Sequence, residues 1–182
     1  MQRTKSIYLA LLTVLLSPMA ANADLIGSNV DANYHFDDLG DIIATGSTTV
    51  SGVIEWESGE SIMLGLFESI DFTGSAIIFD YLVDACCSYN TSGTYNGYTF
   101  EFDAGVLSDL VGLSFAANAY GYVDSMLSWS GDTLFVNWRG APITDVPGVT
   151  IELSFASVPE PGTLALLGLG LVGMAARRKK KV

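Results

Sequence analysis

Polarity alternates with a period of two along several short stretches of the chain, and this pattern most limits the folds open to it. Residues 98–103 read Tyr-Thr-Phe-Glu-Phe-Asp, which puts three aromatic side chains on one strand face. Gly, Ser, Asn and Asp interrupt such stretches every 8–12 residues or so. We therefore predict an all-β fold, an antiparallel β-sandwich with the jelly roll as one such arrangement. The other expected strands are Ser51–Glu57, Ala76–Val83, Leu110–Ala116, Ala119–Trp129, Leu134–Trp138 and Val149–Phe155.

Two stretches depart from this pattern. Asp24–Asp41 is polar and irregular, so we expect a loose N-terminal extension there. Ala104–Leu113 has the composition of a single helical turn. No internal repeat divides the middle of the chain, and its length suits one hydrophobic core. We predict one β-domain over residues 24–157.

Basic residues are confined almost entirely to the two ends of the chain. Between Asp24 and Val158 there are 19 acidic residues and one base, Arg139, a formal charge of −18. Such a body cannot neutralise phosphates, which excludes nucleic acid as a partner. Its many aromatic and β-branched residues argue against intrinsic disorder. An acidic, folded domain is expected.

The first 23 residues have the three parts of a secretory signal peptide. Arg3 and Lys5 precede the apolar run Ile7–Leu16, and Ala21 and Ala23 form a small-residue cleavage site. Ten apolar residues are too few for a hydrocarbon core of ~30 Å, which needs about 20. We predict export through the secretion translocon and cleavage by signal peptidase after Ala23.

The C-terminal end also has three parts. Pro159, Glu160 and Pro161 precede residues 163–176, an apolar segment rich in Leu and Gly that is predicted to be a short transmembrane helix. The chain then ends with five consecutive bases, which place this end in the cytoplasm. The acidic body then faces the periplasm from an inner-membrane-anchored precursor. These bases are Arg177, Arg178, Lys179, Lys180 and Lys181.

This order of elements in residues 158–182 resembles the PEP-CTERM sorting signal of secreted proteins of Gram-negative bacteria. The resemblance implies that an exosortase, a membrane-embedded protease or transpeptidase with a cysteine nucleophile, removes the tail near Pro159-Glu160-Pro161. It also implies delivery to the cell surface or extracellular matrix, in association with exopolysaccharide and biofilm. It says nothing about the activity of the body.

Motifs of catalysis are missing from the sequence, and we expect no enzyme. There is no G-x-S-x-G, no H-E-x-x-H, no phosphate loop and no dinucleotide fingerprint. His35 is the one histidine and is interpreted as a solvated loop residue, with metal ligand or base as the alternative.

Paired carboxylates leave a glycosidase as an alternative. Glu55 and Glu57 would share a strand face about 6–7 Å apart, a separation that glycosidases use. Trp56 would point to the opposite face, away from a sugar bound there. Since the body has 19 acids, same-face pairs arise without selection for chemistry. We interpret this pair, and likewise Glu101 with Asp103, as solvated strand faces.

Calcium is the most natural partner for so many carboxylates. Asp37, Asp38 and Asp41 would supply three carboxylates from one loop, although no EF-hand or related repeat is present. No other cofactor is expected.

Cys86 and Cys87 are adjacent and are the only cysteines. Three states stay open for them: a strained vicinal disulfide, intermolecular disulfides, and free thiols.

Aromatic residues supply a further alternative, a carbohydrate-binding module acting on exported polysaccharide. Core packing claims most aromatics of a sandwich. Tyr89 and Tyr95 flank a polar loop and are expected to be the most exposed. The other candidates for a sugar-stacking face are Tyr98, Tyr120, Tyr122, Trp129 and Trp138.

Overall fold

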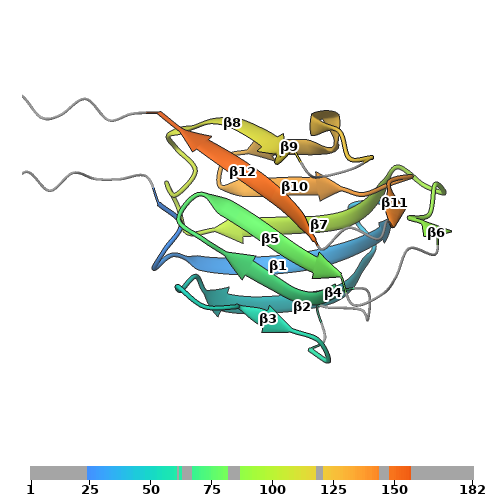
Figure 1. The fold of residues 1–182 in the computed structure, drawn as a ribbon, viewed down its shortest axis with the longest axis horizontal. Coiled ribbons are helices and arrows are strands. Elements are labelled where there is room, and N and C mark those ends of the chain that lie inside the picture. The colour runs from blue at the N-terminus through green and yellow to red at the C-terminus, as the bar shows by residue number, and fades with distance from the viewer. Residues whose placement is uncertain are drawn as a thin grey trace, which may run out of the picture. The chain divides into compact units, whose positions relative to one another are not determined.

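Two antiparallel five-stranded sheets form the part of the chain that the computed structural model describes, residues 24–60, 62, 67–81, 87–117, 121–143 and 148–156 (Figure 1). The first sheet has the order β2 (Ile42–Thr49), β1 (Asn29–Asp37), β7 (Tyr95–Phe102), β10 (Thr133–Asn137) and β9 (Leu127–Ser130). The second has the order β3 (Trp56–Glu57), β4 (Phe67–Phe72), β5 (Ala76–Tyr81), β12 (Val149–Phe155) and β8 (Leu110–Phe115). A short pair, β6 (Cys87–Ser88) with β11 (Pro142–Ile143), and one 3-10 turn, η2 (Asp124–Met126), complete the described elements.

Aromatic side chains of the two sheets contact each other. The ring centroids of Phe72 and Phe100 are 5.3 Å apart, and those of Phe79 and Trp138 are also 5.3 Å apart. Phe79 and Trp138 are fully buried, as is Tyr98, whose ring lies 5.7 Å from that of Phe79. The all-β prediction is confirmed, and these contacts are those expected between the inner faces of a sandwich. The predicted signal peptide and the predicted C-terminal helix lie outside the described residues.

The alternation at residues 98–103 correctly predicted which side chains face the core. Tyr98, Phe100 and Phe102 are buried between the sheets, whereas Glu101 is exposed. Thr99 departs from the pattern because it is buried on the outer face, where the His35 ring covers its hydroxyl.

The predicted loose extension at Asp24–Asp41 is wrong. Residues 29–37 form β1, which pairs with β2 on one side and β7 on the other and so lies inside the sheet. Val30, Ala32 and Tyr34 are its buried face. The small Ala32 and the polar residues between these positions hid the alternation in the sequence.

Two other strand boundaries also differ from the predictions. Within residues 51–57 only Trp56 and Glu57 are a strand, because the backbone before them turns from one sheet to the other. The predicted strand Ala119–Trp129 is also wrong over residues 121–126, which hold a turn and η2, so β9 begins only at Leu127. Residues 103–110 form successive hydrogen-bonded turns, with Val106 N–H donating to the Asp103 carbonyl at 3.2 Å. Within Ala104–Leu113 the structure therefore has turns up to Asp109 without the expected helix, and β8 begins at Leu110.

Strand register gives the two outer faces different side chains. Across the first sheet, one row consists of Thr45, Asn33, Thr99, Phe135 and Ser128, and the next of Ser47, Asp31, Glu101, Thr133 and Ser130. The outer face of the second sheet carries Ser69, Asp71, Asp80, Thr150, Glu152 and Ser114. Carboxylates are therefore frequent on the second face, and short uncharged polar groups on the first.

Both ends of the described body lie beside the turn between β4 and β5. Leu25 N–H donates to the Gly74 carbonyl at 3.1 Å, and Leu153 N–H donates to the Ser75 carbonyl at 2.8 Å. Asp24 and Ala156 consequently leave the β-sheets at the same end (Figure 1).

Candidate functional site

Several predicted site residues fall outside the described part of the chain. These are the signal cleavage residues Ala21 and Ala23, the motif Pro159-Glu160-Pro161, the bases 177–181 and Cys86. Of Cys87 only the backbone is described, paired with Ile143 between β6 and β11. The state of the two cysteines stays a prediction.

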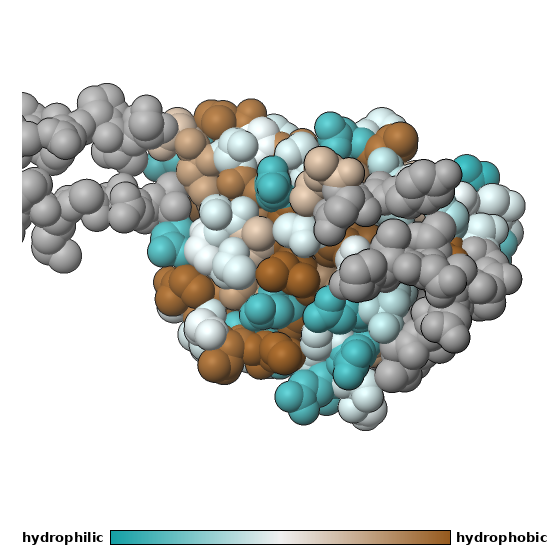
Figure 2. Space-filling view, in the orientation of Figure 1, coloured by the Kyte–Doolittle hydropathy of each residue, from teal (hydrophilic) through white to brown (hydrophobic). Residues whose placement is uncertain are grey.

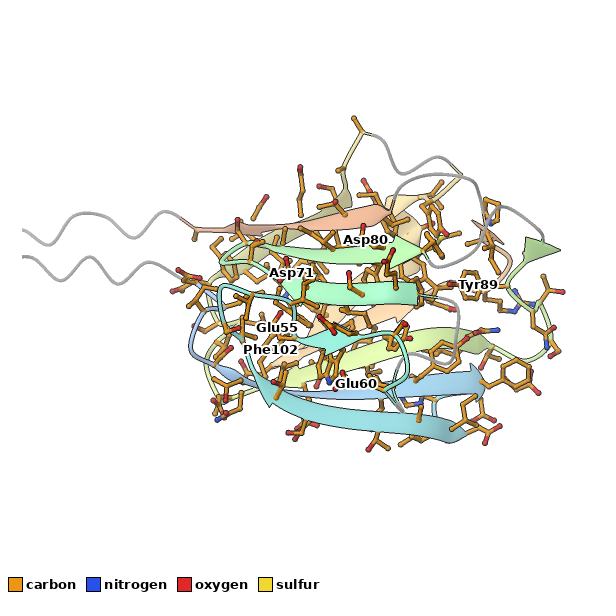
Figure 3. All side chains as sticks on the ribbon, turned by 60° about the horizontal axis from the view of Figure 1, so that its bottom comes forward. Glu55, Glu60, Asp71, Asp80, Tyr89 and Phe102 are labelled. Atoms are coloured by element: carbon orange, nitrogen blue, oxygen red, sulfur yellow. The ribbon has the colours of Figure 1, made fainter. Side chains whose placement is uncertain are left out.

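Three carboxylates come together on the outer face of the second sheet, from β4, β5 and the segment before β3. Glu55, Asp71 and Asp80 lie near one another along this face (Figure 3), and hydrophilic patches interrupt the apolar surface there (Figure 2). Asp80 accepts a hydrogen bond from the Ser69 hydroxyl at 3.1 Å. Asp71 and Asp80 could not be singled out from the sequence, because only the pairing of β3 with β4 and of β4 with β5 brings them to Glu55.

Both oxygens of Glu55 accept backbone hydrogen bonds. Its Oε1 accepts from Ser51 N–H and its Oε2 from Phe72 N–H, each at 2.7 Å. Glu55 thus joins the loop after β2 to the end of β4. The carboxyl group that interacts with Glu55 is that of Asp71. Glu57, with which Glu55 would pair on sequence spacing, has an exposed side chain. Such hydrogen bonds suit a structural carboxylate.

Asp71 keeps its proton more tightly than an ordinary aspartate. Burial raises the pKa of its carboxyl above the usual 3.8, and the neighbouring Glu55 and Asp80 carboxylates raise it further. A carboxyl whose pKa is raised beside another carboxylate could in principle serve as a general acid. Its neighbour Glu55, however, accepts hydrogen bonds from two backbone amides. The two carboxyl groups therefore suit a structural role, holding β3 and β4 together, as well as a catalytic one.

We expect Asp71→Asn to stabilise the folded protein at neutral pH. A carboxyl whose folded pKa is raised stabilises the fold most below its unfolded pKa, and that contribution is lost as pH rises through the folded value. At pH 7 the variant should have a higher Tm than the parent. Its free energy of unfolding should rise by less than about 1 kcal/mol, because the site is partly solvated. Thermal unfolding followed by circular dichroism measures this.

The difference in Tm between Asp71→Asn and the parent should become smaller as the pH falls toward 3.8. Glu152→Gln, on β12 of the same sheet and exposed on the same face, removes the same charge and serves as the control. A lower Tm for Asp71→Asn at pH 7, or a gain no larger than that of Glu152→Gln, would contradict the interpretation.

His35 is buried, so the prediction of a solvated loop residue is wrong. It lies in β1 with 4% of its surface exposed, and its Nε2 is hydrogen-bonded to Thr99 Oγ1 at 2.9 Å. Its ring packs edge-on against Tyr95. Burial lowers its pKa, which favours the neutral imidazole. The packing around it makes His35 a structural residue of the first sheet.

The expectation that Tyr89 and Tyr95 are exposed is also wrong, because they are only 3% and 6% exposed. Tyr95 donates its hydroxyl to the Tyr98 carbonyl at 2.7 Å, and Tyr89 stacks on Trp138. Tyr98, Tyr122 and Trp138 are buried as well, whereas Trp129 is 40% exposed. Tyr120 lies outside the described residues. Core packing therefore takes most of the candidate sugar-stacking aromatics.

A second buried tyrosine group lies where β5 ends. The Tyr81 and Tyr122 hydroxyls are hydrogen-bonded to each other, and Tyr122 also donates to the Pro142 carbonyl at 2.9 Å. Burial raises the pKa of both tyrosines, so the two hydroxyls stay neutral. They join the end of β5 to β11.

The three calcium candidates lie at the turn between β1 and β2. Asp37 accepts a hydrogen bond from the Ser92 hydroxyl, and Asp38 accepts one from Gly40 N–H at 2.7 Å. Within the described ranges, no group of three or more His, Cys, Asp or Glu side chains is placed to hold a metal ion. Calcium binding by Asp37, Asp38 and Asp41 stays a prediction.

Comparison with known proteins identifies the C-terminal end. Among the described residues, no helix has both the length and the apolar character needed to cross a membrane. No curated protein and no solved structure is significantly similar to this chain. Residues 157–180 match the model of the PEP-CTERM protein-sorting motif, which confirms the resemblance seen in the sequence. The chain therefore carries a PEP-CTERM protein-sorting motif, which implies an exported, membrane-anchored precursor that an exosortase processes.

Proposed function

We propose that the processed chain is a non-enzymatic protein of the cell surface or extracellular matrix that is retained there by exopolysaccharide. The single observation that carries this proposal is the PEP-CTERM motif at residues 157–180, directly after an acidic β-body. In the precursor, the body faces the periplasm, and processing near Pro159-Glu160-Pro161 frees it for transfer to the surface.

The body has properties that suit an extracellular protein. Its sheets enclose a core of fully buried aromatic residues, among them Phe79, Tyr98 and Trp138. Its formal charge of −18 between Asp24 and Val158 keeps copies of the protein apart and soluble. Within the carboxylate cluster, Glu55 accepts hydrogen bonds from the backbone on both oxygens and joins two segments of the chain. These features support a scaffold or binding role for the body.

Fractionation of cultures tests the proposal. The chain should be recovered with the matrix of a strain that makes exopolysaccharide, and in the medium of an isogenic strain that lacks polysaccharide synthesis. Loss of retention is expected because the polysaccharide is what holds the processed chain at the surface in this proposal. An equal distribution of the chain in the two strains would overturn the proposal.

A further inference from the structure

The outer face of the first sheet differs from the outer face of the second sheet in its side chains. Asn33, Phe135 and Ser128 lie in one row across β1, β10 and β9, and Ser47, Thr133 and Ser130 lie in the row beside it. Strands are 4.7–4.9 Å apart, so five of them make a platform about 19 Å wide. Apart from one pair of acids, the two rows carry no charge.

The polar groups of these rows are available to a ligand. Within the described ranges, the side chains of Asn33, Ser47, Ser128, Ser130 and Thr133 have no hydrogen-bond partner in the protein. On the second sheet, by contrast, Glu55 and Ser69 are already engaged. Phe135, half-buried between Thr99 and Ser128, adds an apolar patch among the polar groups.

The pair of acids within the platform is an unfavourable arrangement for the protein alone. Asp31 on β1 and Glu101 on β7 are directly opposite each other, and both side chains are exposed. Like charges directly opposite each other destabilise a sheet. Arg139, the one base between Asp24 and Val158, donates instead to the Thr91 carbonyl at 2.6 Å. A ligand that donates hydrogen bonds to both carboxylates would relieve their repulsion.

We infer that this platform binds a neutral polysaccharide. Such a polymer supplies hydroxyl donors for Asp31 and Glu101, and donors and acceptors for Asn33 and the serines. The apolar side of a sugar ring can lie on Phe135. An anionic polymer would be repelled by the two carboxylates and by the formal charge of −18. A cationic polymer would bind preferentially to the carboxylates of the second sheet. The inference rests on the proposed function and specifies the surface that performs it.

Affinity electrophoresis of the full chain tests the inference. The protein is kept in lauryldimethylamine oxide, a detergent without sugar, in gels containing hydroxyethyl cellulose, laminarin, dextran or galactomannan. Alginate and chitosan are the anionic and cationic polymers. At least one neutral polymer should retard the chain, with or without EDTA, and neither charged polymer should do so as strongly.

Variants locate the binding surface. Ser128→Lys extends a long side chain over Phe135 and should weaken binding at least tenfold, and Asn33→Ala should weaken it measurably. Ser154→Lys makes the same change at an exposed position on the outer face of the second sheet and should alter binding less than twofold. Near-UV circular dichroism verifies that each variant keeps the parent fold.

Four results would overturn the inference: no retardation by any neutral polymer, stronger retardation by alginate or chitosan, loss of binding in EDTA, or equal effects of Ser128→Lys and Ser154→Lys. If the chain is retained in the matrix of the producing strain but no neutral polymer retards it, only the inferred polysaccharide-binding surface is refuted. Retardation without matrix retention would refute the proposed function.

Discussion

Replacement of Pro159, Glu160 and Pro161 by alanine should leave the full-length precursor in the inner membrane and abolish its appearance at the surface. These residues lie within the PEP-CTERM motif, residues 157–180. Prolines disfavour helix both at their own position and at the residue before them, a preference that suits the extended substrate of a protease. Alanine, which has the highest helix propensity, removes that preference. Immunoblots of membrane, matrix and medium fractions measure the result.

Two controls accompany this variant. The parent chain in a strain without exosortase should accumulate in the same way as the triple variant. A double variant of exposed body residues, Val53→Ala with Ile54→Ala, should be processed normally. Normal processing of the Pro-Glu-Pro variant would show that the motif is not what the sorting machinery recognises.

Substitution of Gly97 by alanine should destabilise the fold by about 3 kcal/mol, the upper range for overpacking a rigid site. Gly97 lies in β7 between β1 and β10, and a Cβ added there would overlap the Val136 carbonyl oxygen and lie 3.1 Å from Trp138 N. The backbone cannot move aside easily, because Trp138 N–H donates to the Asn96 carbonyl at 2.7 Å. Denaturant unfolding measures the loss.

Gly112→Ala is the matched control. It is also a strand glycine, in β8, but an added Cβ would make only an ordinary contact with Ser154 Cβ at 3.6 Å. This variant should change the free energy of unfolding by less than about 1 kcal/mol. Similar losses for the two alanine variants would mean that the close approach of β7 and β10 at Gly97 is not as tight as described.

The fold class could be predicted because the alternation of polar and apolar residues within a strand indicates which of its faces is buried. At residues 98–103 the alternation predicted three buried aromatics, and Tyr98, Phe100 and Phe102 are buried. The same reasoning failed for Asp24–Asp41. There the buried face contains Ala32, which has too little apolar surface to stand out among the polar residues between.

Site chemistry was harder to predict than the fold. His35 was expected in solvent because its neighbours in sequence are polar, yet Thr99 and Tyr95, more than 50 positions away, enclose it. Glu55 was paired with Glu57 on spacing alone, whereas the strand pairing of β3 with β4 places it beside Asp71. Burial and proton affinity depend on these distant partners, which periodicity does not reveal.

By itself the sequence determined where this protein is sent, and its alternation determined that the body is all-β. Both are local properties: a sorting motif is recognised as a short contiguous peptide, and a strand's two faces follow from the period of the backbone. Only the tertiary structure decided which polar groups meet, because strand register between distant segments sets those contacts. Register places Asp71 beside Glu55, buries His35 against Thr99, and assembles an uncharged row on one sheet and the clustered carboxylates on the other.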